Sequence, residues 1–137
     1  MNNKVLTIGI AAYNVEKTID ACLTSMLYPA INNDIEILVI NDGSTDDTVN
    51  RVNKYVNKYP DTVKIINKKN GGHGSTINAT IKYATGTYLK MVDGDDQVEK
   101  DGLISLVKKL KENEVVDMVF SPYFIVDINT RDKKKIG

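Results

Sequence analysis

Apolar runs alternate along this chain with segments whose hydrophobic residues recur at helical spacing. A continuous apolar run predicts a buried strand, whereas recurrence at i, i+3, i+4 and i+7 predicts an amphipathic helix. Strands are predicted at residues 5–12, 35–40, 62–66, 88–92 and 115–120. The helices between them are expected to bury Ile19, Cys22, Leu23, Met26 and Leu27, then Val49, Val52, Val56 and Tyr59, then Ile77, Ile81 and Ala84, and finally Leu103, Ile104, Val107 and Leu110.

This alternation of strand and helix predicts an α/β fold. Strands that are apolar on both faces are typical of a parallel sheet covered by helices on both sides, with right-handed crossovers. We therefore expect a three-layer α/β/α sandwich with a mainly parallel sheet, forming one domain over residues 1–137. Residues 124–128 and 133–137 read as two strands joined by a turn. We expect that the domain continues beyond Gly137; the alternative is that these residues form a short, solvated basic tail.

Composition narrows the class of protein. The chain has 137 residues, of which 42% are hydrophobic, and its 18 basic and 18 acidic side chains give a net charge of zero. This balance argues against binding to nucleic acid. Cys22 is the single cysteine, which excludes an internal disulfide and fits a reducing compartment. No signal-like start or membrane-spanning run is seen, so a cytoplasmic location is expected.

The most informative segment is the acidic turn at residues 93–96. Asp93, Asp95 and Asp96 lie within four positions, directly after a predicted strand. Carboxylates this close repel one another unless a cation lies among them, and oxygen ligands together with substrate phosphates suit Mg²⁺ or Mn²⁺. The alternative is a solvated turn that caps the helix beginning near Glu99. We favour a site for a divalent cation and a diphosphate.

Polar clusters also follow the first three strands, at residues 13–14, 41–44 and 70–75. In a parallel sheet all four loops share one edge, where ligands of such folds bind. Asp42 could satisfy loop amides or accept the N–H of a nucleobase, and Tyr13 could stack on a base or cover the sheet. Asn14 is expected to cap the following helix, and Glu16 to be favoured by the dipole of that helix.

The loop at residues 70–75 is rich in glycine and precedes a predicted helix. Its bare amides could approach phosphate oxygens, although its position and spacing differ from those of the dinucleotide fingerprint. His73 is the only histidine. It is either an exposed loop residue without a role or a donor to a phosphate or sugar.

Four motifs, taken in order, closely resemble the family 2 glycosyltransferases, which have the GT-A fold. They are residues 9–16 (GIAAYNVE), 36–46 (EILVINDGSTD), 70–72 (NGG) and 93–96 (DGDD). The resemblance covers nearly the whole chain. It implies the transfer of a sugar from a nucleotide-diphosphate sugar, usually a UDP-sugar, with inversion at the anomeric carbon.

The resemblance also implies roles for single residues. Ala12, Tyr13 and Asn14 would line the nucleoside pocket with Glu16 nearby, Asp42 would bind the base, and Gly71, Gly72 and His73 would border the nucleotide. Asp93, Gly94 and Asp95 match the Asp-x-Asp motif that contacts the ribose and the metal, with Asp96 next in line. The acceptor would be a saccharide or lipid-linked molecule in cell-surface polysaccharide or glycolipid synthesis. Peripheral association with the inner face of a membrane would involve other regions.

The chain departs from the family pattern at three places. Asn41 replaces a commoner aspartate, Ile77 stands where many members carry a basic residue, and the general base is expected beyond Gly137. The alternatives are a nucleotidyltransferase, a nucleotide-binding fragment without turnover, and a phosphoacceptor signalling domain. The last needs acids directly after the first strand, where residues 11–14 read AAYN.

Overall fold

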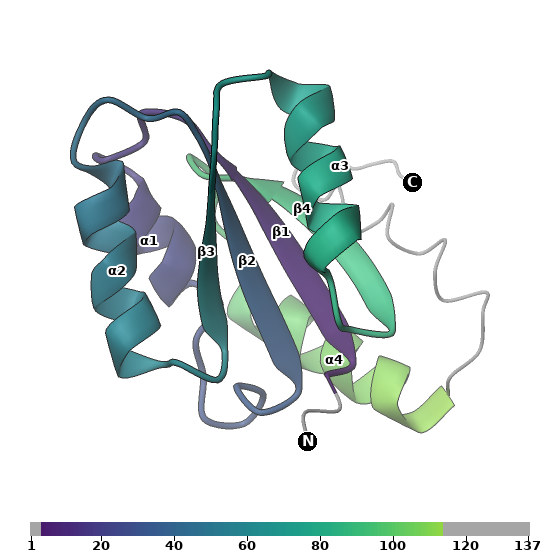
Figure 1. The fold of residues 1–137 in the computed structure, drawn as a ribbon. Helices are drawn as coiled ribbons and strands as arrows, with labels where there is room; N and C mark the ends of the chain where they lie inside the picture. The colour runs from purple at the N-terminus through teal and green to yellow at the C-terminus, as the bar shows by residue number, and fades with distance from the viewer. Residues whose placement is uncertain (1–3, 114–137) are drawn as a thin grey trace.

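The computed structural model describes residues 4–113, which alternate between strands and helices as the sequence pattern predicts (Figure 1). Within this range no helix is both long and apolar enough to cross a bilayer. The predicted strands at 115–120, 124–128 and 133–137 lie outside the described residues. The elements are β1 (Leu6–Ala12), α1 (Ile19–Thr24), β2 (Ile35–Asp42), α2 (Thr48–Lys58), β3 (Val63–Lys68), α3 (His73–Tyr83), β4 (Tyr88–Asp93) and α4 (Lys100–Asn113).

The four described strands form one parallel sheet in the order β3-β2-β1-β4. The prediction of a parallel α/β sheet is therefore confirmed. The strand β1 lies between β2 and β4, pairing Ala11 with both Ile40 and Asp93. The carboxyl ends of all four strands consequently meet at one edge, and the loops that follow them are neighbours.

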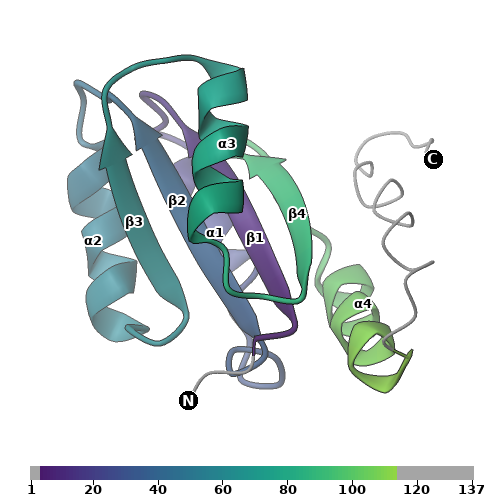
Figure 2. The ribbon, with the colours of Figure 1, turned by 45° about the vertical axis from the view of Figure 1, so that its right-hand side comes forward.

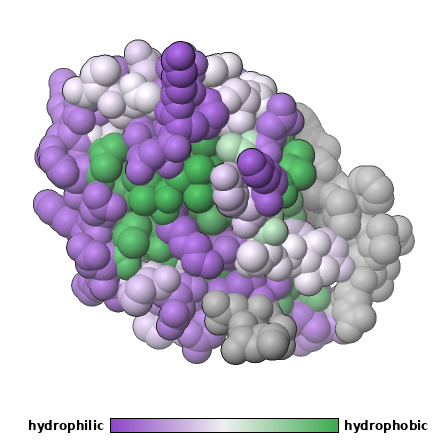
Figure 3. Space-filling view, viewed as in Figure 1, coloured by the Kyte–Doolittle hydropathy of each residue, from purple (hydrophilic) through white to green (hydrophobic). Residues whose placement is uncertain are grey.

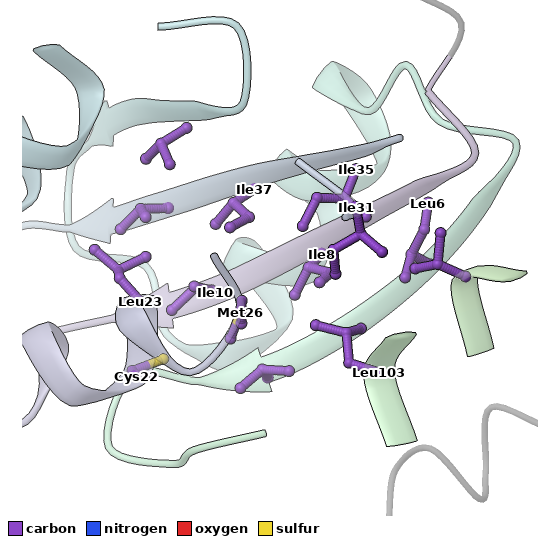
Figure 4. Packing of buried hydrophobic residues seen from close by; sticks show 14 of the residues in the cluster. Leu6, Ile8, Ile10, Cys22, Leu23, Met26, Ile31, Ile35, Ile37 and Leu103 are labelled. Atoms are coloured by element: carbon purple, nitrogen blue, oxygen red, sulfur yellow. The ribbon is translucent and has the colours of Figure 1, made fainter. Parts of the chain in front are cut away.

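Helices α1, α2 and α4 cover one face of the sheet, and α3 covers the other (Figures 1 and 2). Alternate residues of β1 and β2, such as Ile8 and Ile37, point into the core between the sheet and helices α1, α2 and α4 (Figure 4). Cys22 and Leu23 of α1 and Leu103 of α4 are buried in the same cluster. Cys22 is thus a buried hydrophobic residue, as predicted.

The buried face of α3 differs from the prediction. Ile81 is 60% exposed, while Thr76 and Thr80 are buried. The reason is a close approach: a Cβ on Gly9 of β1 would lie 2.6 Å from Thr80 Oγ1. Small side chains therefore face the sheet here, and large ones point outward. Hydrophobic residues gather near the middle of this face (Figure 3).

A buried carboxylate fixes the connection from α3 to β4. Glu36 is 1% exposed and accepts hydrogen bonds from Thr7 Oγ1 (2.8 Å), Lys64 Nζ (3.0 Å) and the amide of Thr85 (2.9 Å). Burial alone would raise the pKa of Glu36, but these donors outweigh it and hold the pKa below its ordinary value. The network anchors the C-terminal end of α3. It thereby helps to fix the position of the glycine-rich loop, which precedes the N-terminal end of the same helix.

Candidate functional site

The acidic turn lies at the carboxyl end of β4, beside the end of β1. Oxygens of Asp93, Asp95 and Asp96 all lie within 4.8 Å of one another, and the three side chains are exposed. Three carboxylate oxygens form the donor set that hard cations such as Mg²⁺ or Mn²⁺ prefer. The residues present therefore fit such a cation, with room on its solvent side for phosphate oxygens.

The turn is held by bonds to β1 and α1. The amide of Gly94 donates to Ala11 O at 2.9 Å, and Thr18 Oγ1 donates to Gly94 O at 3.1 Å. Gly94 is buried, and a Cβ there would lie 3.0 Å from Val15 Cγ2. The backbone that presents the carboxylates is thus fixed from two sides, which favours a preorganised ligand set.

Cys22 of α1 and Ser25, the residue that ends this helix, also contact the acidic turn and the segment after it. Cys22 Sγ donates to Asp93 O at 3.7 Å, and Ser25 Oγ accepts from the amide of Val98 at 2.9 Å. Burial, together with the charges of Asp96, Asp95 and Asp93, raises the pKa of Cys22 to about 12. The thiol therefore remains a protonated donor to the backbone. Thr18, Cys22 and Ser25 were not assigned to the site from the sequence, because a small residue on a helix carries no signal of its partner.

The loops after β1 and β2 interlock. Asn14, with φ of 50°, places its Oδ1 to accept hydrogen bonds from the amides of Thr45 (2.8 Å) and Asp46 (3.3 Å). Glu16 Oε1 accepts from the amide of Asp47 at 2.8 Å. The prediction that Asn14 and Glu16 serve the start of the next helix is wrong: α1 begins at Ile19, and both side chains bind the segment that leads into α2.

Asp42 joins the end of β2 to the glycine-rich loop. Its Oδ1 accepts from the amide of Gly71 (2.8 Å) and its Oδ2 from the amide of Gly72 (3.0 Å). Lys68 Nζ donates to Oδ1 at 2.8 Å. Of the two roles left open for Asp42, binding loop amides is observed, whereas the contact with a base stays a prediction.

The environment of Asp42 keeps its carboxylate ionised. The residue is 4% exposed. Burial alone would raise its pKa, but the bonds from Lys68, Gly71 and Gly72 outweigh burial and hold the pKa below its ordinary value. Lys68 was not recognised in the sequence. The parallel pairing of β2 with β3 places Lys68 beside Asp42 and could have identified it. It was missed because β3 was expected to end two residues earlier.

The remaining candidates differ in what they offer a ligand. Ala12 is fully buried in the core and presents no exposed surface to a nucleoside. Tyr13 is 51% exposed at the same edge. His73 is exposed, but it is the first residue of α3 and not a loop residue. Gly72, with φ of 87°, makes the turn that precedes this helix.

The site therefore combines an acidic cluster and a glycine-rich loop at the same sheet edge. Solved structures share this arrangement of strands and helices. S. aureus TarS (residues 1–349) in complex with UDP-GlcNAc superimposes with a TM-score of 0.68 at 31% sequence identity, covering 80% of this chain and 32% of that one. The fold is the GT-A fold of glycosyltransferases, as the sequence motifs predict.

Sequence comparisons identify the family. The model of Glycosyl transferase family 2 matches residues 7–137, and the chain belongs to this family. It is 34% identical over 117 residues to chondroitin synthase of Pasteurella multocida (strain Pm70), covering 85% of this chain and 12% of the relative. It is 36% identical over 111 residues to poly(ribitol-phosphate) beta-glucosyltransferase of Bacillus spizizenii, covering 80% and 18%. The chain thus spans less than a third of the length of these relatives.

Proposed function

We propose that this chain forms the donor-binding part of an inverting glycosyltransferase that moves a sugar from a UDP-sugar to an acceptor hydroxyl. The observation that carries the proposal is the acidic turn at residues 93–96, which lies at the same sheet edge as Asp42 and the glycine-rich loop. Support comes from TarS, which binds UDP-GlcNAc and UDP at 31% and 30% identity to this chain.

The two halves of the site suit the two ends of a nucleoside diphosphate. Asp42 ends β2 and Asp93 ends β4, with β1 between them. Since neighbouring strands are about 4.8 Å apart, the two strand ends are separated by about 10 Å. We assign the base to Asp42 and the exposed ring of Tyr13, and the diphosphate to the acidic turn. Gly71, Gly72 and His73 border the nucleotide from the start of α3.

Asp93, Asp95 and Asp96 are the residues that would hold Mg²⁺ or Mn²⁺. Such a cation, when bound, acts as a Lewis acid that neutralises charge on the leaving diphosphate. The contribution of the chain is orientation: Thr18 and Cys22 hold the backbone of the turn, so the carboxylates need little rearrangement on binding.

For the acceptor, we propose a saccharide or a lipid-linked polymer precursor at the inner face of the membrane. The support comes from relatives named as a chondroitin synthase and a poly(ribitol-phosphate) beta-glucosyltransferase. One name refers to the synthesis of an anionic polymer and the other to the glucosylation of one. The part of the chain described here assigns no residue to acceptor binding.

Calorimetric titration with UDP, in Mn²⁺ and again in EDTA, tests this function. We expect binding in Mn²⁺ that weakens by at least about tenfold in EDTA, because the carboxylates alone repel a diphosphate. Titration with uridine is the control, since a nucleoside lacks the diphosphate and should not respond to the cation. Equal UDP affinity in both buffers, or no binding in either, would contradict the proposal.

A further inference from the structure

Lys68 lies beside the position that the proposed function gives to the nucleobase, and the following inference depends on that function. Its side chain is 21% exposed, and its Nζ donates to Asp42 Oδ1 at 2.8 Å and to Lys69 O at 2.7 Å. The Asp42 side chain is 6% exposed. Because the Asp42 carboxylate is buried and already accepts hydrogen bonds from the protein, only ligands whose donors match its remaining acceptor sites can bind it well.

The two oxygens of Asp42 are not equivalent. Oδ1 accepts from Lys68 Nζ and from the amide of Gly71, whereas Oδ2 accepts only from the amide of Gly72 among the described residues. A carboxylate has about four lone-pair sites, two on each oxygen. Oδ1 is therefore saturated, and Oδ2 retains one acceptor site for a ligand.

A single acceptor site distinguishes uracil from guanine. Uracil presents one ring N–H between two carbonyl oxygens, whereas guanine presents a ring N–H next to an amino group. A carboxylate with both oxygens available would pair with both guanine donors. With Oδ1 saturated, the amino group of guanine would be left unpaired in a poorly solvated position, which lowers affinity.

Lys68 also has a donor to offer. An ammonium group has three N–H donors, and two of them bind Asp42 and Lys69. We propose that Lys68 is a specificity-determining residue that selects uracil over guanine: it saturates Asp42 Oδ1 and directs its third N–H to a carbonyl oxygen of the base. Asp42 Oδ2 then accepts the uracil ring N–H.

The test is calorimetric titration of UDP and GDP, in Mn²⁺, into the wild-type chain and Lys68→Met. Methionine keeps an unbranched stem but removes the charge and the donors. We expect UDP affinity to fall roughly tenfold, as is typical for a lost charge-assisted hydrogen bond, and GDP affinity to stay equal or rise. The preference for UDP over GDP should therefore fall by at least about tenfold.

Lys69→Met is the matched control, because it removes the same charge from the neighbouring exposed position and should keep the preference. Lys68→Arg should also keep it, and circular dichroism checks folding. If Lys68→Met does not fold, Lys68→Leu decides, with the same expected direction, because leucine also lacks the charge and the donors. An unchanged preference in folded Lys68→Met, or in its replacement Lys68→Leu, with UDP still bound by the wild type, overturns the role of Lys68 alone. Failure of the wild type to bind either nucleotide overturns the proposed function as well.

Discussion

Asp95→Ala is expected to weaken cation-dependent binding of UDP by about a hundredfold or more. Asp95 is exposed and contributes one of the three carboxylate oxygens that lie within 4.8 Å of one another. Removing it leaves two ligands for a cation that must also hold a diphosphate. Isothermal titration of UDP in Mn²⁺ measures the loss directly.

Although Asp95→Ala should weaken UDP binding, it should not destabilise the fold. Without a bound cation the three carboxylates repel one another, so deleting one should leave the free energy of unfolding unchanged or raise it by about 0.5 kcal/mol. Asp61→Ala is the control, because it removes an exposed acid from the turn between α2 and β3, at the other edge of the sheet. It should bind UDP as the wild type does. A normal UDP titration by Asp95→Ala would show that the acidic turn is not the diphosphate site.

Gly9→Ala is expected to destabilise the fold by about 2 to 3 kcal/mol. Gly9 lies in the middle of β1, directly beneath α3. A Cβ there would lie 2.6 Å from Thr80 Oγ1 and 2.8 Å from Met91 Sδ, and closer still to Thr80 Cγ2. Since Thr80 is fully buried, it has no open space to move into, and α3 must shift outward. Urea denaturation measures the change.

A second substitution separates this overpacking from a general intolerance of β1. Thr80→Ala removes both Oγ1 and Cγ2, the atoms nearest to the new methyl group. Alone it should cost about 1 kcal/mol, because Thr80 Oγ1 donates to Thr76 O in the buried interface. In the Gly9→Ala background it should recover more than half of the lost stability. Strictly additive losses would show that Gly9 and Thr80 are not in contact.

The parallel sheet, the four described strands and the edge that carries the site could be predicted from the sequence. Periodicity reveals which residues are buried, and strand order in a parallel sheet brings the following loops together whatever the details of packing. The acidic turn could also be located, because Asp93, Asp95 and Asp96 lie within four consecutive positions directly after a strand. These predictions required no knowledge of contacts between distant residues.

The wrong predictions concern residues whose orientation is determined by contacts with residues distant in the sequence. Ile81 fits the apolar period of α3, but Gly9 permits so close an approach that Thr76 and Thr80 take the buried face. Asn14 fits a helix cap by type, but its left-handed backbone turns the side chain toward the amides of Thr45 and Asp46. In each case a long-range contact overrides a local preference.

Lys68 illustrates a different limit of sequence analysis. The polar residues at the end of β3 gave no apolar signal, so the strand was expected to end at residue 66, whereas it extends to Lys68. The register that pairs Asp42 with Lys68 was therefore hidden. Lysine in a polar stretch is typical of a solvated surface, and only the 2.8 Å contact with a buried carboxylate distinguishes it.

The central claim is that Asp93, Asp95 and Asp96 share a divalent cation with the diphosphate of a uridine nucleotide. Crystals soaked with Mn²⁺ and UDP test it most directly, through the anomalous scattering of manganese. The account predicts one strong anomalous peak among the three carboxylates, with diphosphate oxygens completing its coordination and the uracil ring at Asp42. Bound UDP with no anomalous peak at the acidic turn, or a peak whose ligands do not include these aspartates, would contradict it.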